Sequence, residues 1–320
     1  MSAAPVDEQA ASEIQVPTSR RNKYDARPRQ RNWRASLPYL LLLPAVTVVA
    51  LVVAGPIIQS IGYSFQAYNL RELDLVRFIG LGNYRRALTD VMFWRAARAT
   101  LIWVGVVLPV QFVLGMAIAT LMNRAFKGRT VLRSLVLLPW IIPSTVVALL
   151  WRWLLDGNLG VVNDILIRIG VIDVGIPWLN QPNTAMAAVV IAMIWHGMPF
   201  FALMLLAALQ AVPAELYEAA NLDGASIWQR FRFVTWPTII ATIRTTTLLR
   251  VIWLANSIEV IWIMTVGGPN FATSTLPVVT FFEATRGLDY GFASAVSILL
   301  TLALMVVVLL YLRQMRKDDQ

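Results

Sequence analysis

The chain has 320 residues, of which 58% are hydrophobic and only 14% are charged. Its mean hydropathy of +0.64 excludes an ordinary soluble domain and predicts a membrane protein with several spans. A net charge of +9 would suit a nucleic-acid partner, but the basic residues cluster beside apolar segments, as membrane topology places them, so we expect no nucleic acid. There is no cysteine and a single histidine, His196, which excludes disulfides, thiolate metal sites and a histidine cluster.

The first 34 residues differ in composition from all that follows. Residues 1–34 are rich in Ala, Ser, Pro, Gln and Arg and contain almost no large apolar side chains, so they cannot bury enough surface to offset the entropy lost on ordering. We therefore expect a disordered basic tail. A full-length apolar segment follows its charges, so it is not a cleaved signal peptide and should stay in the cytoplasm.

Six apolar segments are each long enough to cross a bilayer, which takes about 20 residues. No alternating pattern of barrel type is visible, so the sequence predicts an all-α fold with six transmembrane helices in a permease domain of residues 35–313. Breaks at prolines predict kinks in otherwise continuous helices. The segments are 37–60, 97–122, 131–155, 185–210, 237–266 and 291–312, and the breaks are at Pro44, Gly55-Pro56, Pro109, Pro139 and Pro143.

Lysine and arginine set the expected orientation. The N-terminal tail, the loop at 123–133 and the C-terminal tail at 314–320 are basic, whereas the segment at 155–184 carries one arginine against three aspartates. Both termini are therefore expected in the cytoplasm, in a multi-pass protein of the cell membrane whose spans contact lipid. The loop at 66–94 carries four arginines beside three acids and mildly opposes this orientation.

The loop at 213–236 is too polar to lie in hydrocarbon, although it sits between two very apolar segments. Pro213 suits the first position of a short helix, and Gly224 can take the left-handed conformation that ends one. Ser226 followed by Gln229 is a capping-box pattern, which predicts that a second helix begins there. The expected result is a cytoplasmic helical corner.

Residues in and around this loop form a recognisable set. They are Glu218-Ala219-Ala220, Asp223-Gly224-Ala225, Phe231 and Trp236-Pro237 in the loop, WHGMPF at 195–200 and AALQAVP at 207–213 before it, and Gly267-Gly268-Pro269 after it. Together they resemble the EAA loop of permease subunits of bacterial ABC importers, and the flanking residues resemble the carbohydrate branch. The resemblance implies a type I ABC importer permease fold and a non-enzymatic subunit that moves a sugar inward by alternating access.

The resemblance also implies partners. These would be a second, different permease, two ATP-binding cassette subunits and an external substrate-binding (lipo)protein. The chain lacks a G-x-x-x-x-G-K-[ST] loop, so we expect it to bind no cofactor, with ATP and Mg on the cassette subunits. By the resemblance, the ATPase-coupling residues are Glu215, Glu218, Ala219, Asp223 and Gly224.

Polar residues interrupt the fifth apolar segment, where they should face a pathway and not lipid. Arg250, Trp253 and Ser257 share one face of a continuous helix. Mapped by the resemblance, the substrate-pathway residues are His196, Gly197 and Phe200 on the fourth helix, and Arg250, Trp253, Leu254, Asn256 and Ser257 on the fifth. Aromatic faces and hydroxyl-binding groups suit a sugar.

Other interpretations remain open at this point. Trp253 and Phe200 are equally consistent with helix packing, and His196 with a satisfied interhelical hydrogen bond. Arg250 and Glu259 are too far apart along one helix to pair, so each is expected to pair with another chain or to face water. An intramembrane enzyme would need a motif such as H-E-x-x-H or G-x-S-x-G, and neither is present.

The solute is also open. The maltose-importer branch carries several asparagines in the fifth-helix patch, whereas this chain has only Asn256 there, beside Arg250. The Arg-rich, Trp-rich composition and the long tail are similar to actinobacterial trehalose importers, so a disaccharide such as trehalose or maltose is the first expectation. The alternative is another solute such as glycerol phosphate, whose phosphate Arg250 could contact.

Overall fold

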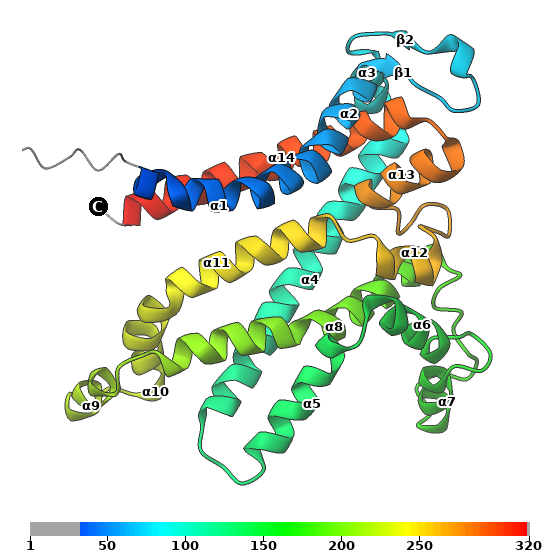
Figure 1. Cartoon of the computed structure of the whole chain (residues 1–320). Coiled ribbons are helices and arrows are strands. Elements are labelled where there is room, and N and C mark those ends of the chain that lie inside the picture. Colours follow the sequence, from blue (N-terminus) through cyan, green and yellow to red (C-terminus); the bar gives the residue numbers. More distant parts are fainter. Residues whose placement is uncertain (1–32, 319–320) are drawn as a thin grey trace, which may run out of the picture. The chain divides into compact units, whose positions relative to one another are not determined.

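The structure is a computed structural model that describes the backbone of residues 33–318 (Figure 1). The expected N-terminal tail lies outside the described residues up to residue 32, as do residues 319–320 of the C-terminal tail. The chain divides into two units, residues 1–55 and 56–320. In the first unit, α1 (Trp33–Val49) continues into a π-helical turn at Ala50–Ala54, and Pro44 lies inside α1 without ending it.

The second unit is almost entirely helical. A two-stranded antiparallel hairpin pairs β1 (Gln66–Ala67) with β2 (Arg77–Phe78), with a 3-10 turn at Leu73–Leu75 between them. The α-helices are α2 (Gly55–Ser64, which begins at the unit boundary), α3 (Gly82–Thr89), α4 (Val91–Asn123), α5 (Arg129–Ile141), α6 (Ser144–Leu154), α7 (Val161–Arg168), α8 (Pro182–Gln210), α9 (Ala214–Leu222), α10 (Ile227–Arg230), α11 (Trp236–Ala255), α12 (Glu259–Thr265), α13 (Leu276–Phe282) and α14 (Tyr290–Asp318), with π-helical turns at Phe231–Thr235 and Glu283–Gly287.

The membrane-spanning prediction is confirmed in outline. Within residues 33–318, five helices are long and apolar enough to cross a membrane, and a sixth span results if the bent pair α5 and α6 counts as one. All six expected segments fall on these helices. The all-α prediction is likewise confirmed, because the only paired strands in the described part of the chain are two residues long.

Continuity was predicted wrongly for two spans. The third segment bends by 96° between α5 and α6, because Pro143 has no N–H to continue the helix and disfavours a helical conformation at Ile142. The fifth segment is interrupted between α11 and α12. There the Asn256 side-chain amide donates to the Ile252 carbonyl at 2.8 Å. The Ser257 N–H donates to the Leu254 carbonyl three residues earlier at 3.1 Å, and this tighter, 3-10-type turn ends the helix. Pro109, by contrast, lies inside a continuous α4.

The core of the second unit forms where α4 packs along α8. Trp103 on α4 is fully buried and donates its indole N–H to the Leu254 carbonyl at the end of α11, at 3.0 Å. Farther along α4, Gly115 lies directly against the α8 backbone at Phe201 and Ala202. In Figure 1, α9 and α10 lie at one end of α8 and α11, and α12 and α13 lie toward the other.

Two arginines of the loop at 66–94, whose positive charge opposed the expected membrane orientation, make contacts within the protein. Arg86 forms an ion pair with Asp289 at 2.7 Å and lies over the Phe292 ring, 4.2 Å from its centroid. Arg71 donates to the Arg286 carbonyl at 2.7 Å. Both therefore tie the hairpin region to the segment that leads into α14, which gives a reason for positive charge in this loop other than membrane topology.

Two glycines of α4 make a matched test of the close approach between α4 and α8. A Cβ at Gly115 would overlap the Phe201 Cβ and lie 3.0 Å from the Ala202 nitrogen, whereas a Cβ at Gly105 would meet nothing within 4 Å. Alanine is favoured over glycine inside helices by about 1 kcal/mol. We therefore expect Gly105→Ala to hold or raise the melting temperature of the purified assembly, and Gly115→Ala to lower it. Equal melting temperatures for the two variants would contradict this packing.

Candidate functional site

Three helices converge on one buried arginine. Arg250 of α11 is 7% exposed, and its Nε donates to Oε1 of the fully buried Gln111 on α4 at 2.8 Å. The Gln111 amide nitrogen in turn donates to the Met193 carbonyl of α8 at 2.6 Å. Gly197 leaves the space that both side chains occupy, because a Cβ there would overlap Arg250 Nη2 and Gln111 Nε2. Arg250 therefore finds a partner within the chain, which the expectation of another chain or water did not include, and it also lines the cavity described below.

The proline break in the third span also positions His196. In an α-helix the Pro139 carbonyl would accept from the N–H of residue 143, and Pro143 has none. His196 Nδ1 lies 2.7 Å from that carbonyl oxygen and donates to it, since a carbonyl can only accept. In its neutral form the ring therefore carries its proton on Nδ1 and leaves Nε2 as an acceptor. The interhelical hydrogen bond that sequence reasoning kept open for His196 is present, and His196 also lines the cavity described next.

A cavity of about 330 Å³ lies where the two broken spans meet. The Ser144 hydroxyl, at the start of α6, donates a hydrogen bond to the Glu259 carboxylate, at the start of α12. Irregular backbone at membrane depth is tolerated where it lines a cavity or is buried in protein, and both breaks satisfy this condition. The residues that line the cavity are Ser144, Met193, His196, Arg250, Trp253, Leu254, Asn256, Ser257, Ile258 and Glu259.

Six of the eight predicted pathway residues line this cavity, and two do not. Phe200 is 2% exposed and lies behind the lining, with its ring centroid 5.0 Å from that of Trp253. Gly197 is buried beneath Arg250. Trp253 itself is 48% exposed, so its packing against Phe200 leaves about half of the side chain accessible.

The shared-face argument was correct for two of its three residues. Arg250 and Trp253 lie on α11, but Ser257 follows the end of this helix at Ala255. Ser257 reaches the same cavity because the backbone turns there.

Five residues of the site were not among the predicted pathway residues: Ser144, Met193, Ile258 and Glu259 on the cavity wall and Gln111 beside Arg250. Gln111 carried a usable signal, since a glutamine in the middle of an apolar span must find hydrogen-bond partners inside the protein. Ser144 carried a weaker one, because it follows a proline that ends a helix. Met193 carried none, because its contribution is a carbonyl oxygen and a thioether sulfur 3.8 Å from Arg250 Nη2.

The polar loop forms the predicted corner. Gly224 ends α9 with a φ of +70°, and Ser226 and Gln229 form both bonds of the capping box. Pro213 occupies the N-cap position and not the first helical position, because α9 begins one residue later. The Tyr217 hydroxyl bonds that of Thr235 at 2.9 Å and holds the two arms together. The five predicted coupling residues are all exposed: Glu215, Glu218, Ala219, Asp223 and Gly224.

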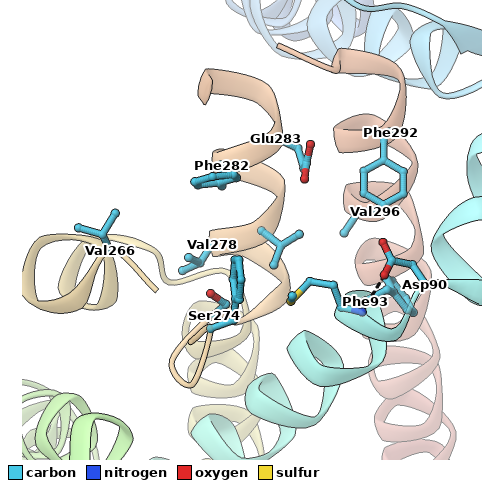
Figure 2. A pocket seen from close by; sticks show the side chains of 12 residues that line it. Asp90, Phe93, Val266, Ser274, Val278, Phe282, Glu283, Phe292 and Val296 are labelled. Atoms are coloured by element: carbon cyan, nitrogen blue, oxygen red, sulfur yellow. Dashed lines mark hydrogen bonds between the residues drawn. The ribbon is translucent and has the colours of Figure 1, made fainter. Parts of the chain in front are cut away.

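A second cavity, of about 210 Å³, contains none of the predicted site residues. Figure 2 shows it between the start of α4, α13 and α14, with Phe93, Phe282 and Phe292 around it and the Glu283 side chain beside α13 and α14. Burial raises the pKa of the Glu283 carboxyl group, although the Arg86 guanidinium opposes the rise. This cavity is mostly apolar and separate from the cavity at Arg250.

The family of binding-protein-dependent transport system inner membrane components matches residues 111–317. The chain belongs to that family. It is similar to the trehalose/maltose transport system permease protein MalF of Thermococcus litoralis, with 36% identity over 289 residues that cover 89% of this chain and 96% of the relative. It is also similar to the diacetylchitobiose uptake system permease protein DasB of Streptomyces coelicolor, with 32% identity over 290 residues that cover 89% of this chain and 88% of the relative.

Solved structures agree with this membership. A bacterial ABC transporter involved in the import of the acidic polysaccharide alginate contains a chain that is 26% identical, with a TM-score of 0.78 over 90% of this chain and 98% of the other. A chain of a bacterial alginate ABC transporter in complex with an alginate pentasaccharide-bound periplasmic protein also matches this chain with a TM-score of 0.78. The resemblance drawn from the loop at 213–236 is thus confirmed: the chain is a multi-pass membrane permease of the sugar ABC importer family, and not an enzyme.

Proposed function

We propose that this permease carries an uncharged sugar, a disaccharide such as trehalose or maltose, into the cell through the cavity at Arg250 and Trp253. The observation that carries the proposal is the composition of the cavity wall. An accessible indole face, which can pack on the C–H face of a sugar ring, lies among hydroxyl, amide, imidazole and guanidinium groups that can hydrogen-bond sugar hydroxyls. A volume of about 330 Å³ falls at the lower end of ordinary ligand sites.

The charges on the wall favour an uncharged solute over the phosphorylated alternative. Arg250 supplies one positive charge and Glu259 one negative charge, and both face the same cavity. A phosphate would gain from Arg250 but would be repelled by Glu259, whereas the hydroxyls of a sugar can donate to the carboxylate and accept from the guanidinium. The names of the trehalose/maltose and diacetylchitobiose relatives support a sugar as the solute.

The energy for transport comes, in this proposal, from hydrolysis of ATP, which two ATP-binding cassette subunits bind together with Mg. A second permease completes the pathway. The loop at 213–236 supports a protein partner, because it exposes large apolar side chains beside its acidic ones. Leu222 is 90% exposed, Phe233 72% and Trp228 69%. The external binding protein delivers the sugar on the opposite side of the membrane, and both termini are cytoplasmic.

Trp253→Ala tests the pathway. Loss of a large flat contact, on the order of 1 to 3 kcal/mol, should lower the initial uptake of radiolabelled maltose or trehalose per assembled complex by about tenfold. Trp153→Ala is the matched control, because Trp153 is 58% exposed on α6 but does not line the cavity. Normal uptake in Trp253→Ala would remove this face of α11 from the pathway. Faster uptake of glycerol phosphate than of either sugar by the unaltered complex would favour the alternative solute.

Gly224→Val tests the coupling corner. A β-branched residue is strained at a φ of +70°, although a Cβ at this position has open space, so the variant acts through the backbone alone. Uptake should fall while the partner ATPase keeps its basal activity. Gly224→Asn should retain most of the uptake, because asparagine tolerates the left-handed conformation. Equal uptake by both variants, in complexes assembled to the same level, would show that the corner does not couple the subunits.

A further inference from the structure

Arg250 has donor groups left over after its contacts within the chain are made. Its Nε is bound to Gln111, and its Nη2 has only the Met193 sulfur at 3.8 Å, a weak acceptor. Neither of the two ion pairs found among the described residues includes Arg250. The two Nη groups therefore have no strong acceptor among the described residues, on a side chain that lines the cavity.

Gln111 holds the opposite edge of the guanidinium, and its own orientation is fixed. Arginine Nε can only donate and a carbonyl oxygen can only accept, so the Gln111 amide cannot be flipped without losing both bonds. Gln111 is fully buried, and the two bonds, at 2.8 Å to Arg250 and 2.6 Å to the Met193 carbonyl, use both ends of its amide. The amide therefore fixes the position of Arg250 relative to α8.

The single glycine of α8, Gly197, leaves the space for this arrangement. A Cβ at Gly197 would overlap both the Gln111 nitrogen and an Arg250 Nη nitrogen. The two side chains thus lie directly against the α8 backbone, one turn after Met193. Such close packing allows little rotation of the guanidinium about its long side chain.

We propose that Gln111 is a positioning residue that aims the two Nη groups of Arg250 at neighbouring hydroxyls of the solute. A planar guanidinium held by Nε presents its outer edge as a fixed pair of donors, which suits two acceptors side by side. Without the amide, the positive charge would stay near the cavity, but the orientation of the guanidinium N–H groups would vary. This inference rests on the proposed function and adds a residue that does not itself line the cavity.

Gln111→Met is the direct test, because methionine keeps the volume and removes both hydrogen bonds. In proteoliposomes containing the whole transporter and its binding protein, we expect uptake of radiolabelled maltose or trehalose to fall about tenfold per assembled complex. Stimulation of ATP hydrolysis by the sugar-loaded binding protein should remain, so the number of sugars moved per ATP should fall. A merely structural role would instead lower uptake and hydrolysis in the same proportion.

Thr100→Val is the control for the loss of a buried hydrogen bond on the same helix. The Thr100 hydroxyl accepts from the Leu276 N–H at 2.9 Å and does not line the cavity. This variant should lower thermal stability and leave the sugar-to-ATP ratio unchanged.

The double variant Gln111→Met with Arg250→Met separates the possible outcomes. If Gln111 acts through Arg250, the double variant should transport no worse than Arg250→Met alone. Fully additive losses, or a normal sugar-to-ATP ratio in Gln111→Met beside a defect in Arg250→Met, would overturn the positioning role and leave the proposed function intact. Normal transport by Arg250→Met would instead contradict the proposed cavity itself.

Discussion

A positive charge buried between apolar helices constrains the centre of this permease. A charged group at membrane depth is costly unless it is hydrogen-bonded, so the helices around Arg250 must supply partners for it. Gln111 does this from α4, and Gly197 opens the α8 backbone to both side chains. The hydrogen bonds from Arg250 to Gln111 and from Gln111 to the Met193 carbonyl thereby fix the relative positions of α4, α8 and α11, beside a cavity that Arg250 lines.

Two helix breaks depend on the same region. The α5–α6 break frees the Pro139 carbonyl, which the His196 ring then satisfies, and the α11–α12 break brings Ser257 and Glu259 to the cavity. Unpaired backbone groups cannot face lipid, so breaks of this kind occur where side chains or a cavity can meet them. Their convergence gives a physical reason for a solute site here that is independent of any relative's name.

Local chemistry was predictable from the sequence, and contacts between distant segments were not. The capping box at Ser226, the left-handed Gly224 and the extent of the apolar segments follow from spacing and residue type over a few residues. Most of the cavity wall was predicted through a family resemblance. The burial of Phe200 and the partnership of Arg250 with Gln111, which lie 139 positions apart, depend on how helices pack, and periodicity does not encode this.

The central claim is that the solute occupies the cavity between the two breaks. Because the chain has no cysteine, Ser257→Cys places its single thiol on the cavity wall. The rate at which a small maleimide labels this thiol can be measured in the assembled transporter with sugar-loaded and with sugar-free binding protein, under conditions that trap the delivered sugar. The account predicts that sugar slows labelling several-fold at this position. Equal rates with and without sugar, in a complex that still transports, would contradict it.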